Sequence, residues 1–308
     1  MSALAFTLVA LLLVGPVPAV LARAAWPMRA PRAAIVLWQS IAVAAVLSAF
    51  SAGLAIASRL FVPGPDGRPT ATITSEIAVL GWPLWLIYVS VFAVTLTIGA
   101  RLVLAVVQVA IATRQRRAHH RNVVDLLGDC PERASGLRVL HVAEPLAYCL
   151  PGVRSRVVLS EGTLSALSDQ ELVAILSHER AHLRARHDLV LEAFVAVHTA
   201  FPRFVRSGSA LSAVQLLVEL LADDAAVRSA GPAPLARALV ACASGRTPSG
   251  ALAAGGPTTV IRVRRLCGRP NSVWLSLGAY VAAAAVLVVP TVAVAVPWLT
   301  ELHRLFST

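Results

Sequence analysis

Residues 168–183 read SDQELVAILSHERAHL, and this stretch decides what kind of domain the chain contains. Ser168 and Glu171 form the S-x-x-E pattern of a capping box, which predicts that a helix begins here. Apolar residues then recur every three to four positions, the spacing that gives a helix one buried face. Because neither proline nor glycine occurs between residues 168 and 201, we expect a single helix from about Asp169 to Ala200.

Two histidines in this helix, His178 and His182, form an H-E-x-x-H pattern with Glu179. Residues four apart lie on one helix face, so both imidazoles can bind the same Zn²⁺. Glu179 is displaced around the helix and can reach a metal-bound water, whose pKa zinc lowers from roughly 15.7 to about 7. It can take the proton of that water and pass it to a leaving amine. The pattern therefore predicts a metallopeptidase site with Glu179 as catalytic base; the alternative is a solvated, charged helix face.

Glu219 is the candidate third ligand, since a catalytic zinc site uses three protein ligands and one open position. It lies in the apolar run VQLLVELLADD at 214–224. Burying an unpaired carboxylate is costly, and a metal would neutralise it; alternatively, Glu219 faces water or pairs with an arginine. Asp223 lies four positions later on the same face, where we expect it to accept the second ring N–H of a ligating histidine.

The composition places this site in a membrane protein. Hydrophobic residues make up 57% of the 308 residues and charged residues 14%, against about 45–50% and about 25% in soluble domains. This excludes a disordered chain and argues against a purely soluble enzyme. A membrane helix needs roughly 20 apolar residues, and four segments qualify: about residues 3–22, 33–58, 77–104 and 271–300. The first has no preceding positive charge, so we expect an uncleaved span, kinked at Pro16 and Pro18.

Arginines supply all 27 basic residues, and the net charge is +11. Such an excess can indicate binding to nucleic acid or to an anionic membrane surface. The arginines gather after the first and third segments and before the fourth. The positive-inside rule then predicts a multi-pass plasma-membrane protein with its N-terminus outside and residues 112–270 in the cytoplasm. Because aromatic residues do not interleave with the arginines, we expect the bilayer as partner and no direct nucleic-acid binding.

Residues 1–111 are therefore predicted to hold three spans, 112–270 one soluble domain, and 271–308 the fourth span with a short outer tail. Arg101 ends the third apolar segment, where we expect its long side chain to reach the inner interface; a functional charge within the membrane is the alternative. The chain has no C-x-x-C pair, so we expect free thiols at Cys130, Cys149, Cys242 and Cys267. Cys149 is the one candidate nucleophile among them, with a free structural thiol as the expected state.

His178-Glu179-x-x-His182 followed by Glu219-x-x-Ala222-Asp223 resembles the signature of gluzincin membrane metallopeptidases. The order of spans and zinc domain is more similar to the M56 group, the beta-lactam sensor-transducer type, than to the related M48 group. The segments AYCLPG (147–152) and RVVLS (156–160) also resemble M56 members. The resemblance implies a mainly α membrane protein: four transmembrane helices with an inserted α+β gluzincin-type (zincin) domain and one Zn²⁺ per chain.

The resemblance also implies a protein substrate, a small winged-helix repressor whose cleavage transmits a signal; self-cleavage is a further possibility. Tyr148, Cys149 and Leu150 would offer backbone to an extended substrate, or form a core strand and turn. For His187 we expect a structural role or one beside a metal ligand. Alternatives are an M48-like quality-control protease or a non-catalytic signalling or scaffold protein. Only residues 301–308 follow the last span, without an S-x-x-K sequence, so we expect no penicillin-binding sensor domain.

Overall fold

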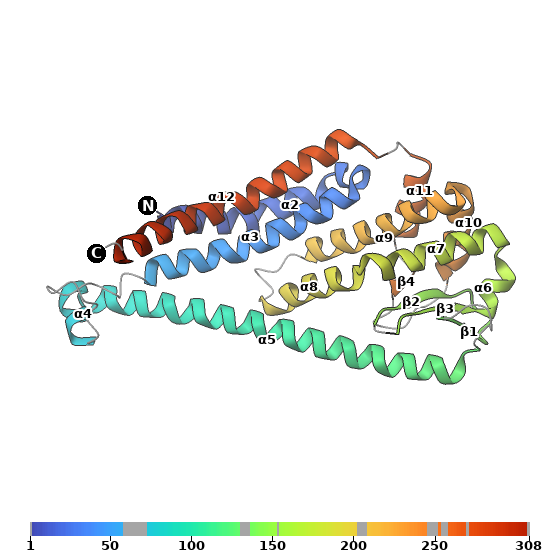
Figure 1. Ribbon diagram of the computed structural model, residues 1–308, viewed down its shortest axis with the longest axis horizontal. Coiled ribbons are helices and arrows are strands. Elements are labelled where there is room, and N and C mark those ends of the chain that lie inside the picture. Colours follow the sequence, from blue (N-terminus) through green and yellow to red (C-terminus); the bar gives the residue numbers. More distant parts are fainter. Residues whose placement is uncertain are drawn as a thin grey trace.

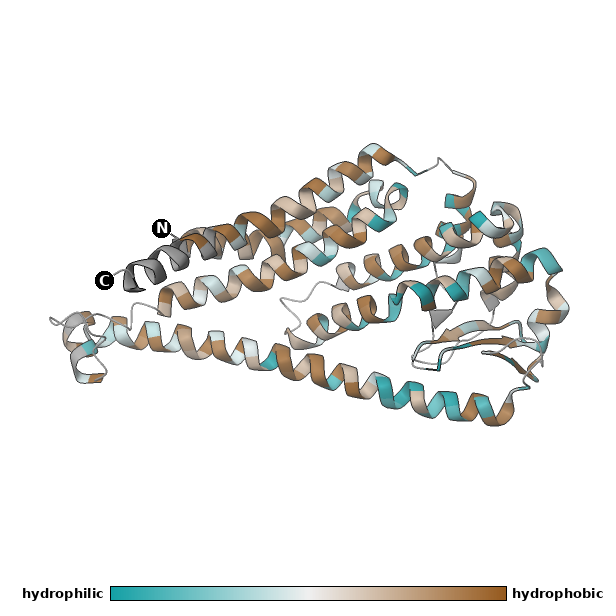
Figure 2. Ribbon diagram, viewed as in Figure 1, coloured by the Kyte–Doolittle hydropathy of each residue, from teal (hydrophilic) through white to brown (hydrophobic). Residues whose placement is uncertain are grey.

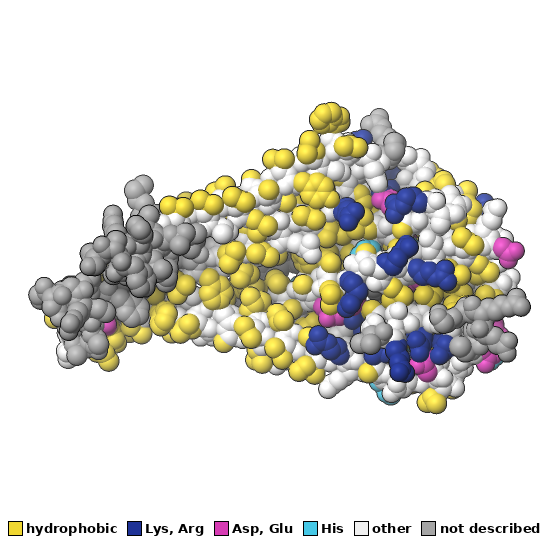
Figure 3. Space-filling view, viewed as in Figure 1, with side chains coloured by type: hydrophobic (Ala, Val, Ile, Leu, Met, Phe, Trp, Pro, Cys, Tyr) yellow, Lys and Arg dark blue, Asp and Glu magenta, His cyan; other side chains and the backbone are white. Residues whose placement is uncertain are grey.

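The computed structural model describes residues 2–57, 73–129, 136–152, 154–201, 208–244, 252–253, 258–268 and 271–306. The expected loop after the second span and Cys130 lie outside these residues. In the described part, long helices converge at one end, and a small sheet with shorter helices occupies the other (Figure 1). Arginine side chains gather over the end that holds the sheet, and apolar side chains cover much of the rest (Figure 3).

Four helical segments among the described residues are long and apolar enough to cross a membrane. This agrees with the predicted number of spans, and their apolar character is visible in Figure 2. The first is split at Gly15, next to the two prolines expected to kink it. The segments are α1 (Ser2–Val14) with α2 (Pro16–Arg23), α3 (Pro31–Ala57), α5 (Trp82–Leu127) and α12 (Val273–Phe306).

The third span differs from its prediction at both ends. Ile73–Leu80 form a separate helix, α4, and Gly81 adopts a φ of 77°, so the span begins at Trp82 rather than at residue 77. Glycine alone enters this left-handed region without steric cost. At its other end α5 continues for 46 residues, to Leu127. No proline follows Pro83 in its first turn, and its one internal glycine, Gly99, does not break the helix before Gly128. At 1.5 Å per residue it is about 69 Å long, so it carries the chain well beyond a bilayer core.

The sheet has the strand order β1-β3-β2-β4 among the described residues, from β1 (Leu137–Leu140), β2 (Ala147–Leu150), β3 (Arg156–Ser160) and β4 (Leu252–Ala253). β1 is parallel to β3, whereas β2 is antiparallel to both of its neighbours. Side chains alternate between faces. Tyr148 and Val158 pack with Val124 of α5 on one face, and Ala147 and Leu159 share a core with α7 on the other.

The motif helix is shorter than predicted. α7 spans Asp169–Ala185 and begins with the expected Ser168–Glu171 capping box. The prediction of a single helix to Ala200 is wrong. Arg186 adopts a left-handed conformation, with φ 51° and ψ 43°, and a second helix, α8 (His187–Ala200), begins after it. This conformation costs roughly 1–2 kcal/mol for an L-residue. The buried contacts of His187 with His182 and of Asp188 with Arg117 offset that cost.

The remaining helices surround α7. α9 (Gly208–Ala230) packs along it, while α10 (Pro232–Ala241) and the short turns η1 (Trp26–Arg29) and η3 (Cys242–Ser244) connect elements. α6 (Glu161–Ala166) follows the sheet, and α11 (Thr259–Leu266) precedes the fourth span. The largest buried cluster joins Trp38 and Ile41 of α3 to Phe194 of α8 and Leu217 of α9. The spans and the domain therefore share one core, so that α8 and α9 are fixed directly against the membrane helices.

Candidate metal centre

His178, His182 and Glu219 converge between α7 and α9. Nε2 of His178 lies 3.1 Å from Nε2 of His182. The Glu219 carboxylate reaches both rings, with Oε2 3.4 Å from His178 Nε2 and Oε1 3.5 Å from His182 Nε2. One ligand atom from each of the three residues falls within a 4.8 Å group. The three residues predicted as ligands are therefore brought together, although they come from two helices.

This arrangement fits a zinc ion. With bonds of 2.0–2.1 Å, adjacent ligands of a tetrahedral zinc lie about 3.4 Å apart, close to the separations between these atoms. Two imidazoles and one carboxylate are also a donor set that catalytic zinc uses, with a fourth position left for water. Glu179 is fully buried on the same helix. Neither of its carboxylate oxygens has a well-formed hydrogen bond to a residue that the structure describes, as expected of a group that meets a metal-bound water.

Both histidines are held by a second residue. Asp223 Oδ1 lies 3.0 Å from Nδ1 of His178, the contact that the sequence led us to expect. Nδ1 of His187 lies 3.0 Å from Nδ1 of His182, so these two rings share one proton between them. Such partners fix the orientation and tautomer of a ligating imidazole. His187 thus acts on His182, and the break at Arg186 is what turns it back toward the site.

Burial and charge set the protonation of this cluster. Burial alone would lower the pKa of His178, but hydrogen bonds to Asp223 and Glu219 outweigh it and raise that pKa to about 9. Burial lowers the pKa of His182 to about 3 and that of His187 to about 4, so both rings are neutral near pH 7. Burial raises the pKa of Glu179 to about 7. A carboxylate with this pKa is suited to take up and release a proton near neutral pH.

Cys149 lies next to Glu179, and burial together with that carboxylate raises the pKa of its thiol well above the ordinary value. A thiol that stays protonated is a poor nucleophile, which argues against the considered catalytic role. Cys149, Cys242 and Cys267 are free thiols. Tyr148 points to the other face of the sheet, where its hydroxyl lies 3.0 Å from Nε2 of His120 on α5.

The strand predicted to meet a substrate, Tyr148–Leu150, lies in β2 beside α7. Its two backbone edges are both paired, with β3 on one side and with β4 on the other, where Tyr148 and Cys149 oppose Ala253 and Leu252. An extended peptide could therefore pair with this edge of β2 only if β4 were displaced from it.

Arg262 on α11 is the site residue that the sequence analysis missed. Only 1% of its side chain is exposed. Its Nε and Nη2 donate to the two oxygens of Asp223 at 2.8 and 2.6 Å, and Nη1 lies 2.9 Å from Glu219 Oε2. In the sequence Arg262 is one of the arginines before the fourth apolar segment, which indicate membrane topology. The sequence feature that could have pointed to it is the number of carboxylates in the apolar run of α9. One divalent metal ion does not neutralise the charges of Glu219, Asp223 and Asp224.

A second arginine of α11, Arg265, binds the next acid along α9. Its guanidinium pairs with the carboxylate of Asp224 at 2.7 Å and donates to the carbonyl of Met28 at 2.7 Å. α11 is thus attached at one point to the metal centre and at another to the turn between the first two spans. Arg101 makes a similar link, since its Nε donates to the Ala200 carbonyl at the end of α8 at 3.4 Å; this favours an anchoring role.

Comparison with protein families gave a match to the family described as BlaR1 peptidase M56 over residues 58–202. The matched region includes the third span, three strands of the sheet and α7 with His178, Glu179 and His182. Glu219 and Arg262 lie beyond it. Comparison with the curated proteins and with the solved structures gave no match.

Proposed function

The match over residues 58–202 supports an M56-type membrane metallopeptidase, and from this premise we propose that the chain is a zinc-dependent endopeptidase. One observation carries the proposal: Glu179 stands buried, with both oxygens free of well-formed hydrogen bonds within the described structure, beside three converging ligands. A scaffold protein that had lost catalysis would have no need for an unsatisfied carboxylate there, since such burial is destabilising.

In the proposed reaction, His178, His182 and Glu219 hold the metal. Zinc, when bound, polarises the substrate carbonyl and lowers the pKa of a bound water. Glu179 accepts the proton of that water and delivers it to the departing amine nitrogen. Asp223 and His187 keep the imidazoles in orientation, and Arg262 pairs with Glu219 and Asp223 of α9, so that with the metal's charge the cluster can remain buried.

We further propose that the substrate is a protein segment bound in extended form along β2, on the cytoplasmic side of the plasma membrane. The backbone of Tyr148 to Leu150 would pair with it once β4 moves from this edge. A small winged-helix repressor is the substrate that we favour, in a signalling role. An M48-like quality-control protease would use the same catalytic residues, and the identity of the accumulating substrate distinguishes the two roles.

The test is a comparison of cells that carry the wild-type chain, Glu179→Gln or Glu144→Gln. Glu144 is an exposed carboxylate outside the site, so its variant controls for the change of charge. We expect one or a few proteins to accumulate uncut with Glu179→Gln alone. A winged-helix protein among them supports signalling, and many misfolded membrane proteins support quality control. Identical proteomes for all three would contradict a peptidase.

A further inference from the structure

A cavity of about 670 Å³ lies where α2 and η1 meet α9 and α11. It is separate from the metal centre, since none of the three metal ligands lines it. Its described lining combines apolar side chains, among them Leu21, Trp38 and Leu217, with arginines from the first inter-span turn and from α11. These arginines are Arg23, Arg29, Arg264 and Arg265.

The charges around this cavity are of one sign. No aspartate or glutamate is among its described lining residues. Arg265 is paired with Asp224, but the described acids form no salt bridge with Arg23, Arg29 or Arg264. Nε of Arg29 is buried and has no hydrogen-bond partner in the described structure. Arg29 is half-buried, and a buried N–H without an acceptor is costly, so the cavity is suited to an anionic group.

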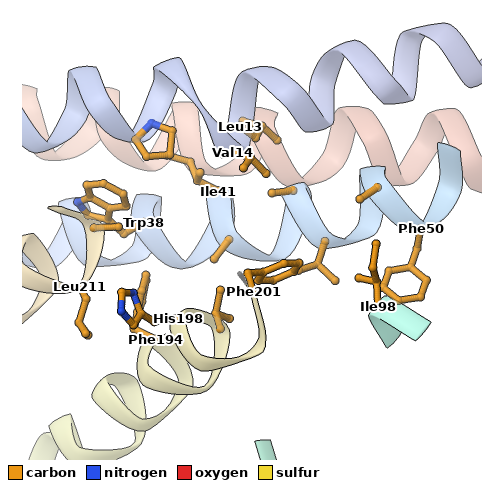
Figure 4. Close-up of a pocket in the computed structure, with 17 residues that line it drawn as sticks. Leu13, Val14, Trp38, Ile41, Phe50, Ile98, Phe194, His198, Phe201 and Leu211 are labelled. Carbon is orange, nitrogen blue, oxygen red and sulfur yellow. The ribbon is translucent and has the colours of Figure 1, made fainter. Parts of the chain in front are cut away.

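Trp38 lines this cavity and also a second, narrower one of about 140 Å³. The second cavity lies between the spans and is bounded by α1, α3 and the end of α8, with Trp38 near one end and Phe50 and Ile98 at the other (Figure 4). Its lining is almost wholly apolar. Trp38 is 2% exposed, and its indole N–H has no acceptor among the described residues. The wider cavity thus carries charge, the narrower one is apolar, and an unpartnered donor stands between them.

We propose that the two cavities form one binding site for an anionic phospholipid. The phosphate lies among Arg29, Arg264 and Arg23, because guanidinium groups bind phosphate oxygens through paired, charge-assisted hydrogen bonds. An acyl chain passes Trp38 into the cavity between the spans. Basic pockets between membrane helices on the cytoplasmic side recognise anionic headgroups in this way, and a bilayer is where the chain meets such a ligand. The site does not depend on the metal chemistry.

The proposal can be tested on the full chain, purified in mild detergent and stripped of lipid. Native mass spectrometry would follow titration with phosphatidylglycerol, with phosphatidylcholine and with glycerol 3-phosphate. We expect one tightly held phosphatidylglycerol per chain, weaker binding of the zwitterionic lipid, and no binding of glycerol 3-phosphate at the same concentrations. Equal retention of both lipids, or displacement of the lipid by glycerol 3-phosphate, would overturn the site.

The matched variants are Arg29→Gln/Arg264→Gln and, as control, Arg184→Gln/Arg228→Gln, which removes two exposed arginines outside both cavities. Each cavity arginine should contribute about fivefold, so the first pair should weaken binding about 25-fold and the control should not. Wild-type affinity in the first pair would contradict the proposal. The position of the acyl chain has its own test. The fluorescence of Trp38 is the part of the signal that Trp38→Phe removes, and phosphatidylglycerol with a nitroxide on its acyl chain should quench that part. Unquenched Trp38 fluorescence would overturn the proposed path of the acyl chain.

Discussion

The membrane spans and the metal centre are built in opposite ways. In the spans, large apolar side chains face outward: Leu8, Leu104 and Leu277 are 60, 55 and 54% exposed. At the metal centre, charged and polar side chains face inward, and His178, Glu179, His182, Asp223 and Arg262 are all at most 1% exposed. The first pattern is stable only where lipid replaces water. The second is stable only where each charge finds a partner.

This contrast indicates which residues serve structure and which serve function. Outward-facing leucines in the spans follow from the bilayer and need no further role. A buried network of two acids, one arginine and the histidines does need one, because apolar residues of similar volume would stabilise the domain at least as well. The same argument applies to Arg29 of the cavity beside α11, whose buried Nε has no hydrogen-bond partner among the described residues.

Removal of the metal should have the largest effect on the metal centre and little effect on the spans. We expect a chelator to abolish peptide cleavage and to lower the unfolding temperature of the domain, because Glu219 and the two histidines lose their shared partner. Added zinc should restore both. Thermal unfolding with and without chelator measures this, and an unchanged melting temperature would show that the cluster is satisfied without metal.

Arg262→Met should be the most damaging single change outside the ligands. It leaves Asp223 and Glu219 buried without their cation, for a loss of about 3–5 kcal/mol in the free energy of unfolding. Arg262→Lys, which keeps the charge, should lose less. Arg237→Met provides the control, because the Arg237–Glu171 pair lies at the surface, where such pairs contribute at most about 1 kcal/mol. Denaturant titration compares the free energies of unfolding of the three variants. Equal losses would show that Arg262 contributes no more than a surface arginine.

Two exposed leucines test the other region of this comparison, the outward-facing side chains of the spans. Leu277→Asp puts a charge on the outer face of α12, which should cost about 2.5–3.5 kcal/mol of membrane insertion if the position is near the bilayer centre, and less toward its surface. Leu126→Asp changes a leucine that is 84% exposed at the far end of α5, where water is expected and the effect should be close to zero. Membrane-fractionation and insertion assays would measure both. Similar behaviour of the two variants would contradict the proposed extent of the membrane region.

Arg186→Gly should have the smallest effect and the opposite sign. Glycine adopts the left-handed conformation at this position without strain, so we expect a gain of up to about 1 kcal/mol. Loss of the contact between the exposed Arg186 side chain and the buried Asp188 carboxylate would offset part of it. Arg184→Gly, inside α7, should instead lose about 1 kcal/mol. The free energies of unfolding of the two variants should therefore differ in sign.

The sequence was sufficient for features that depend on local pattern. The capping box, the metal-ligand spacing on α7 and the four apolar segments each follow from helix periodicity or length. Glu219 and Asp223 could be placed together because they share one helix face. The start of the third span was also readable at Gly81, but a count of uncharged, mostly apolar residues passes over a single glycine.

Features that depend on distant contacts could not be predicted in this way. The break at Arg186 is stabilised by His187 against His182 and by Asp188, whose partner Arg117 lies on α5 at 3.1 Å. Arg262 reaches the site from a helix that follows α9 only after a long connection. The pairing of β4 with β2 likewise joins residues about a hundred positions apart, and no local propensity specifies it.

The zinc content of two carboxylate variants tests the central claim most directly. The full chain should bind one zinc ion, Glu179→Gln should still bind one while losing cleavage, and Glu219→Gln should bind far less. This outcome would separate the catalytic carboxylate from the ligating one. A full complement of zinc in Glu219→Gln, or loss of zinc in Glu179→Gln, would contradict the assignment of the site.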